Sequence, residues 1–90
     1  MEKTVITVVG KDSVGILAKV SGKCAEHGLN IIEVTQSVLQ DMFCMIMLAE
    51  IDKMDLPFGS FSEQMSKMGE ELGMDIHVMH EDIFNAMHRI

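Results

Sequence analysis

The stretch TVITVVGKDSVGILAKV, residues Thr4–Val20, decides the fold of this chain. Its first part, Thr4–Val9, consists of β-branched residues, which favour an extended strand. The segment GKDSVG, Gly10–Gly15, follows at once and is made mostly of residues typical of turns. From Val14 onward, apolar and small residues recur at spacings of three and four, which indicates one buried face of a helix. The stretch therefore predicts a strand, a tight turn and a helix in direct succession.

The predicted helix runs from about Ser13 to His27. We expect Asp12 or Ser13 to cap its amino end, and Gly28 to end it in a left-handed turn. The apolar and small positions of its stripe are Val14, Leu17, Ala18, Ser21, Cys24 and Ala25.

Two further extended runs follow the helix. In Asn30–Val38, the side chains of Ile32, Val34 and Val38 alternate with polar ones, which predicts a strand with one buried face. The run MFCMIMLAEI, Met42–Ile51, is apolar on both of its alternating faces. Such a pattern is typical of a strand in the middle of a sheet that is covered on both sides.

A second helix is predicted after the third strand. Its start is expected near Pro57 or at Ser60, which with Glu63 matches the capping-box pattern, and its end at Gly73. The apolar stripe of this helix comprises Phe58, Phe61, Met65, Met68 and Leu72. Since Met42, Met45 and Met47 belong to the central strand, we expect most of the methionines to lie in the core.

The remaining residues predict a fourth strand and a short helix. Met74–His80 alternates again, and Glu81–Ile90 has acidic residues first and basic residues last, as a helix dipole favours. The order is thus βαββαβ plus a tail, an α+β ferredoxin-like fold with a four-stranded antiparallel sheet and two helices on one face. A chain of 90 residues fits one domain, 1–90, in which 81–90 form the helical tail.

Composition excludes several classes of function. With 7 Lys and Arg against 14 Asp and Glu, the formal charge is −7, and no Trp or Tyr is present, so nucleic-acid binding is not expected. No stretch of about 18 apolar residues could span a membrane, and the first residues do not resemble a signal peptide, so we expect a cytoplasmic protein. Cys24 and Cys44 are too few for a disulfide framework.

No catalytic motif is present, so the sequence does not predict an enzyme, a metal or a cofactor. His77 and His80 are spaced as H-x-x-H, but positions i and i+3 of a strand point to opposite faces. A metal-binding protein that uses His77, His80 and His88 is therefore a distant hypothesis. These histidines could equally contact a partner.

Two features point to binding. The turn Gly10–Gly15 leads into a helix amino end, where backbone N–H groups and the helix dipole favour a carboxylate or phosphate, although a well-capped turn without a ligand has the same sequence. In addition, one face of the third strand is apolar and has no helix of its own. Either a second copy of the chain or the C-terminal helix would cover that face.

Two motifs in this sequence resemble those of the ACT domain family. VVGKDSVGIL (Val8–Leu17) is similar to the strand-turn-helix signature of the family, with Asp12 and Gly15 in place, and HGLNI (His27–Ile31) is similar to its helix end and second strand. The tail IFNAMHRI (Ile83–Ile90) further resembles small stand-alone ACT proteins related to the ACT halves of the glycine cleavage repressor. Ser13 and Val14 stand where many relatives place Arg-Pro.

The resemblance implies regulation by a small molecule, most often an amino acid, in a homodimer or larger oligomer that acts on a separate enzyme or transcriptional regulator. It places the ligand between the first turn of one copy and the second strand of another. The residues implied at this site are Asp12, Ser13, Val14, Gly15, Ile16 and Asn30. The alternative is a dimerisation or partner-docking module that binds no ligand.

Overall fold

A computed structural model describes residues 2–11 and 14–87 of the chain. The elements follow in the order β1 (Lys3–Gly10), α1 (Ile16–Glu26), β2 (Asn30–Leu39), β3 (Met42–Glu50), α2 (Phe58–Leu72), β4 (Asp75–His80) and α3 (Glu81–Met87). The predicted βαββαβ order with a C-terminal helix is therefore confirmed.

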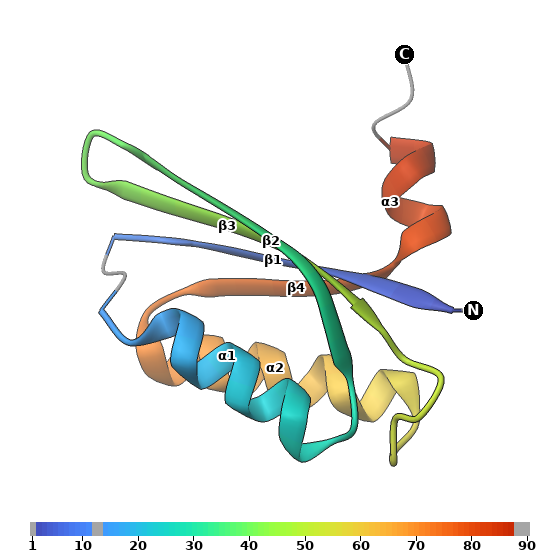
Figure 1. Cartoon of the computed structure of the whole chain (residues 1–90). Coiled ribbons are helices and arrows are strands. Elements are labelled where there is room, and N and C mark those ends of the chain that lie inside the picture. The colour runs from blue at the N-terminus through green and yellow to red at the C-terminus, as the bar shows by residue number, and fades with distance from the viewer. Residues whose placement is uncertain (1, 12–13, 88–90) are drawn as a thin grey trace.

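The four strands form one antiparallel sheet in the order β2-β3-β1-β4. Helices α1 and α2 cover one face of this sheet, whereas α3 extends from the end of β4 on the other side, near the N-terminus (Figure 1). As the apolar pattern of Met42–Ile51 predicts, β3 is a central strand. Strand β2 lies at an edge, and its hairpin with β3 extends beyond the helices (Figure 1).

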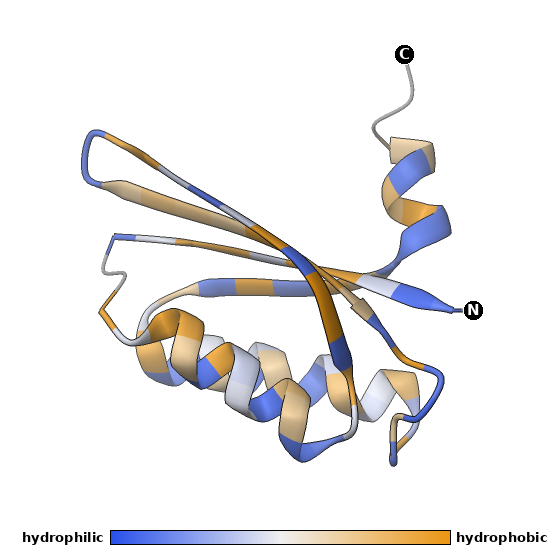
Figure 2. Ribbon diagram, in the orientation of Figure 1, coloured by the Kyte–Doolittle hydropathy of each residue, from blue (hydrophilic) through white to orange (hydrophobic). Residues whose placement is uncertain are grey.

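The core lies between the sheet and its two covering helices. Side chains that alternate along the central strands, such as Ile6, Val8, Met45 and Met47, are fully buried there. The helices add Val20, Cys24, Phe61 and Met65, which have no exposed surface. Figure 2 shows the same division, with hydrophobic and hydrophilic residues interleaved along α1 and α2. The prediction that most methionines lie in the core holds for Met45, Met47, Met65 and Met74, whereas Met42 and Met87 are exposed.

Helix α1 begins later than predicted, whereas α2 begins at the first of its two predicted positions, next to Pro57. Helix α1 begins at Ile16, three residues after the predicted Ser13, because Gly15 adopts a left-handed conformation with φ 70° and breaks the helical geometry. Helix α2 follows Pro57, whose fixed φ suits a helix start, so the capping-box pair Ser60 and Glu63 lies inside the helix. The predicted helix ends are confirmed.

A bulge in β2 changes which side chains face the core. The register with β3 shifts between Ile31 and Glu33. As a result Ile31 packs against the core, whereas Ile32, which the sequence predicts on the buried face, is 42% exposed. Val38, predicted on the same buried face, is 66% exposed and lies next to the last residue pair before the turn of the hairpin.

The face of the sheet opposite α1 and α2 is only partly covered. Helix α3 packs against β1 and β4, and Val5 on that face is buried. Farther along the same face, Leu39, Met42 and Ile46 stay exposed. The C-terminal helix thus covers one end of the apolar face and leaves the other open. No helix within residues 2–11 and 14–87 is long and apolar enough to cross a membrane.

Cys24 predicts a loss of stability at alkaline pH. Burial raises the pKa of its thiol from 9.0 to about 11, so between these values the unfolded chain loses the thiol proton while the folded chain keeps it. Stability therefore falls as pH rises through this range. In urea unfolding, we expect wild type to lose about 1–3 kcal/mol more than Cys24→Ala between pH 9.0 and about 11.

The matched control is Cys44→Ala, which removes a half-buried thiol on the other face of the sheet. Its alkaline loss should equal that of wild type. An equal loss in wild type and Cys24→Ala would contradict the assignment.

Candidate functional site

The amino end of α1 is the first part of the candidate site. Its N-cap residue is Gly15, so no side-chain hydrogen bond caps the helix, and the first turn contains no acidic residue. Among residues 2–11 and 14–87, no atom lies within 4 Å of a Cβ built on Gly15, so this part of the chain leaves room for an approaching group. Val14 is 85% exposed, whereas Ile16 is only 3% exposed and belongs to the core. Asp12 and Ser13 lie outside the described residues.

A small cavity of about 100 Å³ adjoins this helix end. It is lined by Val14, Ile16, Lys19, Leu72 and Met74. Lys19 adds a positive charge to the positive end of the helix dipole. The region therefore favours a negatively charged group such as a carboxylate.

The second part of the site surrounds Asn30, at the start of β2. A larger cavity of about 320 Å³ lies here, lined by Gly28, Asn30, Glu50, Asp52 and Lys53. Asn30 Nδ2 donates a hydrogen bond to Glu50 Oε1 over 3.3 Å, and Asp52 Oδ1 accepts one from the backbone N–H of Glu2 over 2.9 Å. These groups are mostly hydrogen-bond acceptors, so this end of the domain suits a donor-rich or cationic group.

The two parts lie at opposite ends of α1. The helix has 11 residues, which corresponds to about 16 Å between Gly15 and the start of β2. One copy of the chain therefore brings Val14, Gly15 and Ile16 together but does not bring Asn30 to them. A small ligand could contact both parts only if a second copy supplied one of them.

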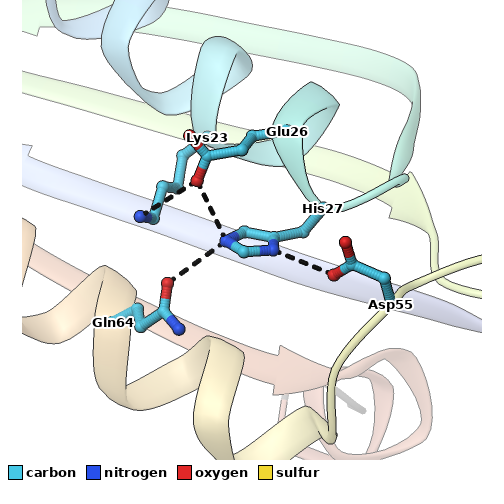
Figure 3. Close-up of polar contacts among 5 residues, drawn as sticks. All are labelled: Lys23, Glu26, His27, Asp55 and Gln64. Atoms are coloured by element: carbon cyan, nitrogen blue, oxygen red, sulfur yellow. Dashed lines mark hydrogen bonds and ion pairs between the residues drawn. The ribbon is translucent and has the colours of Figure 1, made fainter.

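A histidine cluster fixes the carboxyl end of α1 (Figure 3). His27 Nδ1 lies 2.9 Å from Asp55 Oδ1, in the loop after β3. On the other side of the ring, Nε2 lies 3.2 Å from Gln64 Oε1 of α2 and 3.2 Å from Glu26 Oε2. The side chain of His27 is 15% exposed, and its ring meets Phe61 edge-on. One side chain thus joins α1, α2 and the loop that borders the larger cavity.

The backbone reinforces this junction. The N–H of Asp55 donates to the carbonyl of His27 over 3.1 Å. Gly28 has φ +81°, and a Cβ built on it would lie 2.5 Å from the carbonyl oxygen of Lys53. Only glycine fits this position without a backbone shift. The glycine predicted as a helix terminator therefore also allows the close contact that positions Asn30.

No motif in the sequence indicated the residues that surround Asn30 in the structure. Glu50 is the last residue of β3, Asp52 and Lys53 follow the strand, and only the pairing of β2 with β3 brings them to Asn30. Asp55 and Gln64 likewise reach His27 from separate elements. The sequence contains no spacing signal for contacts of this kind, although His27 and Asn30 both belong to the HGLNI motif.

The histidines near the C-terminus do not converge. His77 pairs with Thr7 on the open face, whereas His80 pairs with Thr4, whose side chain is buried. The prediction that the two side chains point to opposite faces is confirmed, and His88 lies outside the described residues. Among the residues that the structure describes, no group of three His, Cys, Asp or Glu side chains could hold a metal ion.

Comparisons with known proteins agree with this fold. The sequence-family model described as the ACT domain matches residues 2–79 of this chain. A UPF0237 protein of Methanopyrus kandleri is 46% identical over 90 residues, which is 100% of both chains. The structure of an ACT domain protein from Streptococcus pneumoniae has a TM-score of 0.82 at 40% identity, covering 97% of this chain and 98% of that one.

A structure described as a glycine cleavage system transcriptional repressor has a TM-score of 0.70 at 23% identity, over 88% of this chain and 45% of that chain. This likeness concerns the fold alone. The family match and the close relatives together show that the chain belongs to the ACT domain family. ACT domains are regulatory ligand-binding modules, and the predicted family resemblance is confirmed.

The contact between His27 and Asp55 predicts that the stability effects of substitutions at these two residues are coupled. His27→Ala should lower the free energy of unfolding by about 1–3 kcal/mol because it removes a mostly buried ring that packs on Phe61, and Asp55→Ala by about 1 kcal/mol because it leaves Nδ1 of that ring without its partner. In a double-mutant cycle, the two changes should show a coupling energy of roughly 0.5–3 kcal/mol, measured by urea unfolding.

The control cycle uses His80 and Glu2, whose side chains are more exposed and lie 3.4 Å apart at His80 Nε2 and Glu2 Oε2. Its coupling should be at most about 1 kcal/mol. Additive effects of the His27 and Asp55 changes would show that their contact does not hold this junction.

Proposed function

We propose that the protein is a regulatory small-molecule module that binds an amino acid between two copies of the chain and acts on a separate enzyme or regulator. The single observation that carries this proposal is the free edge of β2. This strand has 10 residues, lies at the edge of the sheet, and is exposed at every position except Ile31 and Val34. A long edge strand without Lys or Pro is a template for pairing with another chain.

The topology explains why such pairing would complete the site. Helix α1 and strand β2 are joined by the short turn at Gly28, so they run in opposite directions (Figure 1). The Leu39 end of β2 therefore lies toward the amino end of α1. If two copies paired their β2 edges antiparallel about a two-fold axis, Asn30 of one copy would lie beside the Leu39 end of the other.

Asn30 of each copy would thereby approach Gly15 of the other copy. The backbone N–H groups and Lys19 at the amino end of α1 suit a carboxylate. The acceptors around Asn30 suit an ammonium group. An α-amino acid carries both groups on one carbon, so the proposed pair of half-sites matches its two charged ends.

One specific observation favours a second candidate function, an assembly module without a ligand. The apolar side chains Leu39, Met42 and Ile46 on the sheet and Ile83 and Met87 on α3 are exposed by 39–77%. A surface of this kind is typical of protein interfaces. In this alternative the module would associate with itself or a partner whether or not a small molecule is present.

A ligand screen tests the proposal. Differential scanning fluorimetry with each common amino acid at millimolar concentration should show a rise in Tm for at least one of them. A ligand at a hundred times its dissociation constant stabilises the folded state by about 2.7 kcal/mol. Asn30→Ala should lose this rise in Tm, whereas Asn85→Ala in α3 should keep it. If no amino acid stabilises the wild-type protein, the assembly alternative is favoured.

A second test targets the edge of β2. Thr35 is exposed near the middle of the strand, so Thr35→Lys would place two like charges close to the proposed two-fold axis. We expect this variant to be monomeric in analytical ultracentrifugation and to lose at least tenfold in amino-acid affinity. Thr35→Gln, of similar length but uncharged, should stay dimeric. A monomeric variant that binds the amino acid as tightly as wild type would show that one copy suffices.

A further inference from the structure

The larger cavity contains a charged acceptor that the sequence does not single out. Glu50, at the end of β3, lies opposite Asn30 in the strand register, and their side chains are hydrogen-bonded over 3.3 Å. Because a carboxylate can only accept, the amide nitrogen of Asn30 must face Glu50. This contact turns Asn30 Oδ1 away from Glu50. The pair therefore offers two kinds of acceptor, an amide oxygen and a carboxylate.

The charge of Glu50 is not neutralised by a neighbouring cation. Lys3 lies opposite Glu50 on β1, and Lys53 lines the same cavity. Within residues 2–11 and 14–87, however, neither lysine forms an ion pair with Glu50, whose side-chain hydrogen bond goes to the uncharged amide of Asn30. The second acid, Asp52, instead accepts from the backbone of Glu2. Glu50 is thus the carboxylate that a cationic group entering the cavity would meet.

The size of the cavity matches a small ligand. Its volume of about 320 Å³ lies at the lower end of the range for small-molecule pockets. Gly28 contributes no side chain to the wall, and its conformation is fixed by the close contact with Lys53. Gly28 therefore contributes only backbone to the cavity, while Asn30, Glu50, Asp52 and Lys53 supply its polar side chains.

We propose that Glu50 determines specificity by binding the protonated amine of the ligand, with Asn30 Oδ1 as a second acceptor. This inference rests on the proposed function, because it assigns the recognition of one end of the amino acid. It requires a ligand with an ammonium group. The α-hydroxy acid with the same side chain has the carboxylate but not the cation, so it should bind weakly.

Glu50→Gln tests this role without removing the contact to Asn30, because the Gln amide oxygen can still accept from Asn30 Nδ2. The probes are the amino acid that binds wild type most tightly in the screen and its α-hydroxy analogue, for example L-alanine and L-lactate. By calorimetry, wild type should prefer the amino acid by about tenfold or more, as for a hydrogen bond to a charged group. Glu50→Gln should lose about tenfold for the amino acid and leave the hydroxy acid unchanged.

Glu63→Gln is the matched control, because Glu63 is exposed on α2 and the variant has the same net charge as Glu50→Gln. It should bind both probes as wild type does. The preference for amino acid over hydroxy acid is a ratio measured on one sample, so partial loss of folded protein does not alter it.

The outcomes separate the two proposals. If wild type and Glu50→Gln bind the amino acid equally, the role of Glu50 is overturned while amino-acid binding stands. If both probes bind wild type equally, recognition of the amine is overturned as well. If no common amino acid binds wild type, the proposed function fails and this inference fails with it.

Discussion

The junction around Gly28 is the constraint on which the candidate site depends. Here the chain leaves α1 and enters β2 while touching the loop that follows β3. Gly28 lies against the carbonyl of Lys53, and the backbone N–H of Asp55 donates to the carbonyl of His27. The His27 side chain adds contacts to Asp55 and to Gln64 of α2 (Figure 3). These contacts hold the loop after β3 beside Gly28, while the pairing of β2 with β3 places Asn30 beside Glu50, and together they define the larger cavity.

The order of elements could be predicted because it depends on local patterns. Runs of β-branched or apolar residues and period-two alternation identified the strands. Gly28 and Gly73, whose backbone is in the left-handed region, ended the helices where expected. The one error at a helix start concerns α1. Capping by a Ser or Asp side chain is one of several ways to begin a helix, and here Gly15 occupies the N-cap position instead.

The site could be predicted only in part. Motif resemblance indicated Val14, Gly15, Ile16 and Asn30, but Glu50 and the cluster around His27 arise from contacts between elements far apart in sequence. The bulge in β2 shows the same limit. A strict period of two places Ile32 on the core, and one extra residue in the strand places Ile31 there instead.

A site divided between two copies has a thermodynamic consequence that suits regulation. If a ligand binds only where two chains meet, its binding free energy also stabilises their association, and association in turn raises ligand affinity by the same factor. A chain of 90 residues with no catalytic motif can then report ligand concentration through its assembly. Under the proposed function, ligand occupancy and association would be coupled in this way without any large change within one domain.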